Sequence, residues 1–258
     1  MDKPRITVIT VCYNSAATIR DTLESIALQS YKNFEHIIVD GGSTDDTLVI
    51  VRGWIGHAIR LVSEPDNGIY DAMNKGLSLA TGEVVGFLNA DDTYSDSSVL
   101  GQIANAFQDR TLDACYADLV YVSQDDQRVI RYWRSRDFRK GDFALGWCPA
   151  HPTFYARRSV IERLGYFDDT LKLAADAELM MRYLERWGIR SRYIPRVWVR
   201  MRLGGKTNRS LKNIIQQNRE ILIALAKNNI PVSPLLFAAN KIINRIRQFV
   251  SGLARRYR

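Results

Sequence analysis

Short apolar runs rich in β-branched residues alternate with amphipathic stretches over the first 90 residues of this 258-residue chain. Four of them predict strands, and each ends in polar or turn-forming residues: "RITVITVCYN", "FEHIIVD", "RLVSE" and "EVVGFLN". Apolar residues three and four positions apart predict helices between them, over 16–30, from about 44 to 54 and over 67–80. Such close alternation predicts an α/β fold with a largely parallel sheet that helices cover on both faces.

The second half of the chain is less regular. Residues 113–123 and 128–135 predict two strands joined by the polar turn "QDDQ", and residues 137–156 predict an irregular segment. Further helices are expected over 157–165, over 174–188 and from about 209 to 228, with a strand over 191–203.

Composition limits the class of protein. The chain is 46% hydrophobic and 25% charged, which is typical of a globular domain. It contains no run of 18 apolar residues, and its N-terminus does not resemble a secretory signal, so we expect neither a membrane span nor secretion. Three widely spaced cysteines argue against a disulfide framework or a zinc site and favour a reducing cytoplasm.

Charge is distributed unevenly along the chain. Residues 1–185 hold 19 Lys and Arg against 27 Asp and Glu, whereas residues 186–258 hold 17 against 1. The C-terminal region therefore predicts an anionic partner, which could be a nucleic acid, a membrane surface or a phosphorylated substrate.

Polar residues follow three of the predicted strands, as Asn14, "DGGSTDD" (40–46) and "NADD" (89–92). Ligands bind at the carboxyl ends of strands in sheets of this kind, so we expect these residues to line a crevice. Taken alone, "DGGSTDD" can equally be a sharp turn in which Ser43 or Thr44 caps the next helix, and "NADD" a solvated turn. The chain contains neither GxGxxG nor GxxxxGK[ST], which disfavours dinucleotide and P-loop sites.

Two long stretches resemble the nucleotide-sugar-binding half of the family 2 glycosyltransferases: "VITVCYNSAATIRDTLESIALQSYKNFEHIIVDGGSTDDT" and "SEPDNGIYDAMNKGLSLATGEVVGFLNADD". The likeness resumes in "HPTFYARRSVIERLGYFD", in "AADAELMMR" and, more weakly, in the loop "GGKTN". It implies a GT-A fold, with a Rossmann-like, mostly parallel central sheet flanked by helices. Residues 1–92 would form the nucleotide-sugar half, 93–205 the acceptor and catalytic half, and 206–258 a basic helical extension.

The resemblance also implies roles for single residues. The base and ribose would be held by Thr10, Val11, Tyr13, Asn14 and Asp40. The ribose and diphosphate would lie near Asp66, Gly68 and Lys75. Lys206 would close over the diphosphate, or would be an ordinary surface lysine. The residues implied to bind the nucleotide sugar are Thr10, Val11, Tyr13, Asn14, Asp40, Gly41, Gly42, Ser43, Asp66, Gly68, Lys75, Asn89, Ala90, Asp91 and Lys206.

"NADD" occupies the place of the family's DxD motif, which implies a divalent cation, Mn²⁺ or Mg²⁺, held by Asp91 first and Asp92 second. Hard cations prefer carboxylate oxygens and share them with phosphates, and the cation would offset the repulsion between adjacent carboxylates. Asn89 stands where the family often has an Asp that contacts ribose. Its amide can still hydrogen-bond a hydroxyl.

Asp176 aligns with the catalytic base of inverting family members, and Glu178 with an acidic residue two places later. Ala175 replaces the first acid of the usual pair. Without the resemblance, Asp176 would be interpreted as a helix N-cap. His151 is a second catalytic candidate in an acceptor-side loop, although a lone histidine is more often structural.

The C-terminal segment "KIINRIRQFVSGLARRYR" places apolar residues on one helical face and basic residues largely off it. Such a helix can lie on an anionic membrane, or can pack on its own domain or on a partner subunit. The first interpretation predicts a peripheral protein on the cytoplasmic face of the cell membrane.

The whole pattern predicts an inverting glycosyltransferase that moves a sugar from a nucleotide donor, UDP-linked by preference, to a glycan acceptor. The acceptor would be a lipid-linked sugar in surface polysaccharide or O-antigen assembly. A sugar-1-phosphate nucleotidyltransferase and a non-catalytic nucleotide-sugar-binding protein are the alternatives. A nucleic-acid partner is disfavoured, because the basic region matches no known motif for it.

Overall fold

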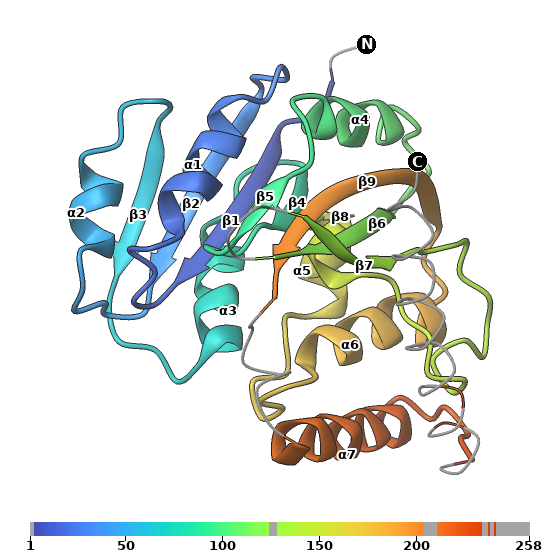
Figure 1. Ribbon diagram of the computed structural model, residues 1–258. Coiled ribbons are helices and arrows are strands. Elements are labelled where there is room, and N and C mark those ends of the chain that lie inside the picture. Colours follow the sequence, from blue (N-terminus) through green and yellow to red (C-terminus); the bar gives the residue numbers. More distant parts are fainter. Residues whose placement is uncertain (1–2, 124–127, 204–210, 234–236, 238–239, 241–258) are drawn as a thin grey trace.

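The computed structural model describes residues 3–123, 128–203, 211–233, 237 and 240. Among these residues, a nine-stranded sheet crosses the molecule in the order β3-β2-β1-β4-β8-β6-β9-β5, with β7 paired to β6 (Figure 1). The strands are β1 (Ile6–Cys12), β2 (Phe34–Asp40), β3 (Ile59–Ser63), β4 (Val84–Phe87), β5 (Asp92–Tyr94), β6 (Ala114–Val122), β7 (Val129–Trp133), β8 (Tyr155–Arg157) and β9 (Ser191–Arg202).

The first half of the sheet is parallel, as predicted. β1 pairs in parallel with β2 on one side and β4 on the other, and β2 pairs with β3. All seven residues of β1 are buried, because helices cover both faces of the sheet. The carboxyl ends of β1, β2 and β4 therefore meet along one edge.

Antiparallel strands join the two halves. The three-residue β8 lies between β4 and β6 and runs antiparallel to both. Its Tyr155 is fully buried and packs where a Cβ atom on Gly86 of β4 would stand 2.2 Å from the ring. The Tyr155 hydroxyl meets that of Tyr94 in β5 at 2.6 Å. Gly86 is therefore required by the tight packing at this joint.

Alternate residues of β1 enter different cores. Ile9 and Val11 pack with side chains of α3, α5, α6 and α7, whereas Val8 and Cys12 face α1, α2 and α4. The helices are α1 (Ile19–Ala27), α2 (Thr47–Arg52), α3 (Ile69–Leu79), α4 (Val99–Ala106), α5 (Arg158–Leu164), α6 (Ala175–Met180) and α7 (Leu211–Lys227), with the short helical segments η1 (His151–Thr153) and η2 (Met181–Arg186).

The expected α/β fold and the hairpin of β6 and β7 are confirmed. Three local expectations are wrong. α1 begins at Ile19, since the Ser15 carbonyl accepts its first N–H at 2.9 Å and no side chain caps the helix. β5 and β8 were not expected, because a strand of three residues is too short to show a period. α2 is shorter than predicted, and its N-cap is Asp46.

α7 packs against α6, and its Ala224 and Leu225 are fully buried in the same core as the α6 side chains. Among the helices of the described residues, none has the length and apolar character that a bilayer span requires. Lys206 and the basic segment 241–258 lie outside the described residues.

Candidate active site

The loops after β1 and β2 are tied together by side-chain hydrogen bonds. Asn14 adopts a left-handed conformation with φ 50°, and its Oδ1 accepts from the backbone N–H of Thr44 (2.9 Å). Ser43 Oγ accepts from the N–H of Asn14 (2.8 Å). The exposed ring of Tyr13 stands beside this joint. The structure thus brings together residues that lie about 30 positions apart in the sequence.

Asp40 organises the turn that follows β2. Its Oδ2 accepts from the N–H groups of Gly42 (3.1 Å) and Ser43 (3.0 Å) and from the Ser63 hydroxyl (2.8 Å), and its Oδ1 accepts from the Ser43 hydroxyl. Burial favours the neutral acid, but the hydrogen bonds from Ser43, Ser63 and the loop backbone outweigh it and hold the pKa of Asp40 below its usual range. The carboxylate is therefore charged at neutral pH and fixed in orientation.

The loops that follow β2 and β3 touch each other at Gly41 and Asp66. A Cβ atom on Gly41 would stand 2.3 Å from Asp66 Oδ2, so any other residue here must displace the Asp66 carboxylate. Asp66 Oδ1 accepts from the N–H of Gly68, the N-cap of α3, whose φ is 121°. Lys75, on α3, pairs with Glu64 at 2.9 Å. Gly41, Asp66 and the start of α3 thus form a wall beyond the ends of β2 and β3.

Four predicted ligands of the nucleotide have buried side chains: Thr10, Val11, Asp40 and Ala90. The Thr10 hydroxyl donates to the carbonyl of Leu88 (2.7 Å). These positions can offer a ligand their backbone groups.

The adjacent acids Asp91 and Asp92, here called the acidic doublet, lie in different environments. Asp91 is half-buried, whereas Asp92 is the first residue of β5 and has no exposed surface. Neither carboxylate oxygen of Asp92, nor Asn89 Oδ1, has a hydrogen-bond partner among the described residues. Burial, and next the charge of Asp91, raise the pKa of Asp92 well above its usual range, against the opposing effect of Arg202. Asp92 is thus a buried acid with unfilled acceptor positions, and does not belong to a solvated turn.

Asp176 is the second residue of α6 and is half-buried. It does not cap the helix, because the N-cap is Ala174 and no side chain makes a capping hydrogen bond. Its Oδ1 accepts from the hydroxyl of Tyr70 on α3 (3.0 Å). Burial, and then the charge of Asp176, raise the pKa of Tyr70 well above its usual range. The hydroxyl therefore keeps its proton and acts as a donor.

His151, in η1, is buried between Phe87 and Phe167, with ring centroids 5.7 Å apart in both cases. Burial lowers the pKa of His151, although the charge of Asp176 opposes this. The imidazole is therefore neutral at pH 7. It borders an apolar cavity of about 20 Å³, about the size of one water molecule, lined also by Leu77.

Glu178, the second acid of α6, is paired inside the protein. It is 2% exposed, pairs with Arg182 at 3.0 Å and accepts from the Asn228 amide at 3.1 Å. These contacts attach α6 to the end of α7, so Glu178 has a structural role.

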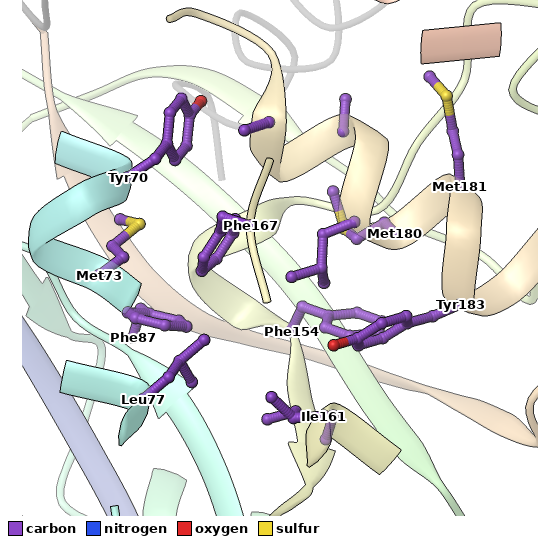
Figure 2. Close-up of a cluster of buried hydrophobic side chains, with 14 of the residues drawn as sticks. Tyr70, Met73, Leu77, Phe87, Phe154, Ile161, Phe167, Met180, Met181 and Tyr183 are labelled. Atoms are coloured by element: carbon purple, nitrogen blue, oxygen red, sulfur yellow. The ribbon is translucent and has the colours of Figure 1, made fainter. Parts of the chain in front are cut away.

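Sequence reasoning did not place Tyr70 or Phe167 in the site. Tyr70 precedes Met73 and Leu77 at helical spacing, which predicts a core position, and it is indeed buried (Figure 2). Its hydroxyl contact with Asp176 connects residues 106 positions apart. A polar tip on an otherwise apolar helix face was the available signal.

Comparison with known sequences identifies the family of the chain. The profile of glycosyl transferase family 2 matches residues 7–165. A PGL/p-HBAD biosynthesis glycosyltransferase of Mycobacterium bovis is 31% identical over 199 residues, which is 75% of each chain. The chondroitin synthase of Pasteurella multocida is 23% identical over 86% of this chain but only 23% of its own length.

Solved structures share the fold. The mannosyltransferase PcManGT from Pyrobaculum calidifontis, in complex with GDP-Man and Mn²⁺, superposes with a TM-score of 0.69 at 24% identity over 98% of this chain and 75% of its own. S. aureus TarS 1–349 in complex with UDP gives 0.63 at 21% identity over 92% and 69%. The chain spans 41% of a longer TarS structure. The profile match over most of the chain and the mycobacterial relatives show that this protein belongs to glycosyl transferase family 2, and it is a glycosyltransferase with a GT-A fold.

Proposed function

We propose that this enzyme is an inverting glycosyltransferase in which Asp176 is the catalytic base. The carboxylate would take the proton of an acceptor hydroxyl as the acceptor oxygen bonds to the anomeric carbon of the donor sugar. The bond from that carbon to the nucleoside diphosphate breaks at the same time. Attack from the face opposite the leaving group inverts the configuration, and no covalent enzyme intermediate forms.

The observation that carries this proposal is the contact of Asp176 with Tyr70. In this contact Tyr70 engages only Oδ1 of Asp176. The Asp176 side chain is half-exposed, and its Oδ2 has no hydrogen-bond partner among the described residues. A base needs a free oxygen that a substrate can reach, and the free Oδ2 of a half-exposed carboxylate supports this role. The other acid of α6, Glu178, is fully engaged by Arg182 and Asn228.

The proposed donor is a nucleoside-diphosphate sugar, UDP-linked by preference. Complexes of TarS with UDP and with UDP-GlcNAc support a uridine donor, whereas the PcManGT complex holds GDP-Man. The wall formed by Asp40, the adjoining glycines and Asp66 would receive the nucleoside. Lys75 and Lys206 remain proposed contacts of the diphosphate.

The doublet fits a hard divalent cation. The carboxylate oxygens of Asp92 lack donors among the described residues, and Asp91 beside it is half-exposed, so a cation would reach Asp91 first. The described residues contain no group of three or more His, Cys, Asp or Glu suited to a metal, so diphosphate oxygens would complete its shell. When bound, Mn²⁺ or Mg²⁺ would neutralise charge on the departing diphosphate.

The proposed acceptor is a glycan, attached to a lipid on the cytoplasmic face of the membrane. The names of two relatives, a PGL/p-HBAD biosynthesis enzyme and a chondroitin synthase, support a glycolipid or polysaccharide product. Residues 186–258 hold 17 Lys and Arg against 1 acid, which would favour an anionic membrane surface. Surface polysaccharide or O-antigen assembly would use such a reaction.

Replacing Asp176 tests the proposal. Asp176→Asn should reduce transfer about 10³-fold, because a neutral amide cannot accept the proton. Donor affinity, measured by calorimetry with UDP-sugars and Mn²⁺, should stay within about two-fold of wild type, because the amide is isosteric. Asp169→Asn, an exposed carboxylate of the same region, is the matched control and should remain active. Full activity of Asp176→Asn would remove Asp176 from the mechanism.

A thermal-shift screen identifies the donor. UDP-linked and GDP-linked sugars, each with and without Mn²⁺, are compared, and a ligand that binds only the folded chain raises its melting temperature. Stabilisation by GDP-sugars alone would contradict the uridine preference.

A further inference from the structure

Tyr70 and Asp176 connect the two halves of the enzyme. Tyr70 lies in the first turn of α3, two residues after Gly68, and Asp176 lies in the first turn of α6. The hydrogen bond between them, at 3.0 Å, is therefore made by a residue of the nucleotide half to a carboxylate of the acceptor half.

The donor side of this bond is rigid. Tyr70 is 9% exposed, and its ring stacks on Phe167 with centroids 5.6 Å apart and planes 29° apart. Phe167 is held in turn by Phe87, edge to face at 5.4 Å (Figure 2). With its ring fixed, the tyrosine has little freedom to move the hydroxyl.

The acceptor side is rigid in its backbone. Ala174 and Ala175 are fully buried where α6 begins, so the Cα atom of Asp176 has a fixed position. The Asp176 side chain itself is half-exposed and could rotate about its χ angles. The Tyr70 hydroxyl is what selects one orientation, and it engages Oδ1 while leaving Oδ2 without a partner among the described residues.

We propose that Tyr70 is a positioning residue for the catalytic base: its hydroxyl holds Oδ1 of Asp176 so that Oδ2 faces the acceptor hydroxyl. The proposal rests on the assignment of Asp176 as the base. Tyr70 itself makes no bond to substrate in this scheme and acts only through Asp176.

A kinetic consequence follows. Loss of the hydroxyl frees the carboxylate to rotate, and misplacement of a reacting group by about 1 Å can cost about 100-fold in rate. Because Tyr70 makes no bond to the donor in this scheme, the loss should appear in kcat and leave the donor KM unchanged.

Tyr70→Phe tests this, because it keeps the ring on Phe167 and removes only the hydroxyl. We expect kcat to fall about 10- to 100-fold and the donor KM to stay within about two-fold. Tyr183→Phe is the matched control: Tyr183 is also buried, and its hydroxyl donates to the Gly165 carbonyl at 2.6 Å instead of to a carboxylate. It should leave kcat and the donor KM as in wild type. Melting temperatures of both variants show that each is folded.

The double variant separates positioning from a structural role. Because Tyr70 would act only through Asp176, adding Tyr70→Phe to Asp176→Asn should cause no further loss of the residual transfer. If the double variant loses transfer by the product of the two single losses, Tyr70 acts through the fold and the proposal is overturned. A wild-type kcat for Tyr70→Phe, beside an inactive Asp176→Asn, would also overturn it and leave the base assignment standing. An active Asp176→Asn would overturn both.

Discussion

The proposed nucleotide half (residues 1–92) and the proposed acceptor half (residues 93–205) are built by different kinds of contact. In the nucleotide half, β1, β2, β3 and β4 pair in parallel, and the loops that follow β1 and β2 are joined by Asn14 and Ser43, about 30 residues apart. In the acceptor half the three-residue β8 fills the centre of the sheet, and Asp176 depends on a hydroxyl 106 positions away. The candidate site residues are therefore joined across about 30 positions in one half and across 106 positions in the other.

The packing of Gly86 against Tyr155, where the two halves join, should give the largest loss of stability when it is disturbed. Gly86→Val should destabilise the chain by about 3 kcal/mol, because the new side chain overlaps the buried ring of Tyr155. Urea unfolding measures the loss. Gly101→Ala, in α4 with open space around it, is the control and should stabilise by about 0.5–1 kcal/mol. Equal effects of the two changes would contradict the tight joint.

Inside the nucleotide half, two histidines should make stability depend on pH. Trp54 donates to His57 Nδ1 (3.1 Å), His57 Nε2 lies 2.9 Å from His36 Nδ1, and His36 Nε2 lies 2.9 Å from the Thr10 hydroxyl, an arrangement that suits neutral rings. Burial, and then the charge of His57, lower the pKa of His36 from 6.5 to about 3. The unfolded chain therefore binds more protons between these values.

Stability should be complete above pH 6.5 and decrease below it by about 1.4 kcal/mol for each pH unit, or roughly 2 kcal/mol at pH 5. Urea unfolding of wild type and of His36→Gln, from pH 7.5 to 5, measures this loss. His36→Gln should show a smaller slope. The same slope in both would rule out His36 as its origin.

Asp92, the buried member of the acidic doublet, should make stability depend on pH in the direction opposite to His36. Because burial raises the pKa of Asp92 well above 3.8, the folded chain keeps this proton at pH values where the unfolded chain has lost it. Stability from this group is therefore lost as pH rises above 3.8. Asp92→Asn should raise the free energy of unfolding at pH 7 by about 1–2 kcal/mol without metal, and reduce the rise in melting temperature that Mn²⁺ and a donor produce together. A less stable apo variant would contradict the unpaired state of Asp92.

The smallest expected effect concerns the turn at Gly41. Gly41→Ala must push the Asp66 carboxylate aside, which a side-chain end can do at a cost below about 1 kcal/mol in stability. Donor affinity should nevertheless fall about 5- to 10-fold if Asp66 contacts the nucleotide sugar. Calorimetry with the preferred donor measures this, and unchanged affinity would exclude Asp66 from the donor site.

Sequence pattern predicted the strands of four or more residues better than the shorter ones. β1, β2, β4 and the hairpin of β6 and β7 were recognisable, because each is an apolar run rich in β-branched or aromatic residues. β5 and β8 were not recognisable, because three residues carry no period and their pairing partners lie far away in the sequence. The site residues were suggested by a family resemblance and not by periodicity.

The chain by itself determined the order of its elements, the polar turns that end β1, β2 and β4, and the family to which it belongs. These features depend on residues close together in sequence, whose spacing already limits the backbone. Only the tertiary structure decided that Asp92 is buried while Asp91 is half-exposed, that Glu178 is structural, and that Asp176 is held by Tyr70. Charge, burial and orientation of a carboxylate are set by whichever groups packing brings against it, and here those groups lie as many as 106 residues away.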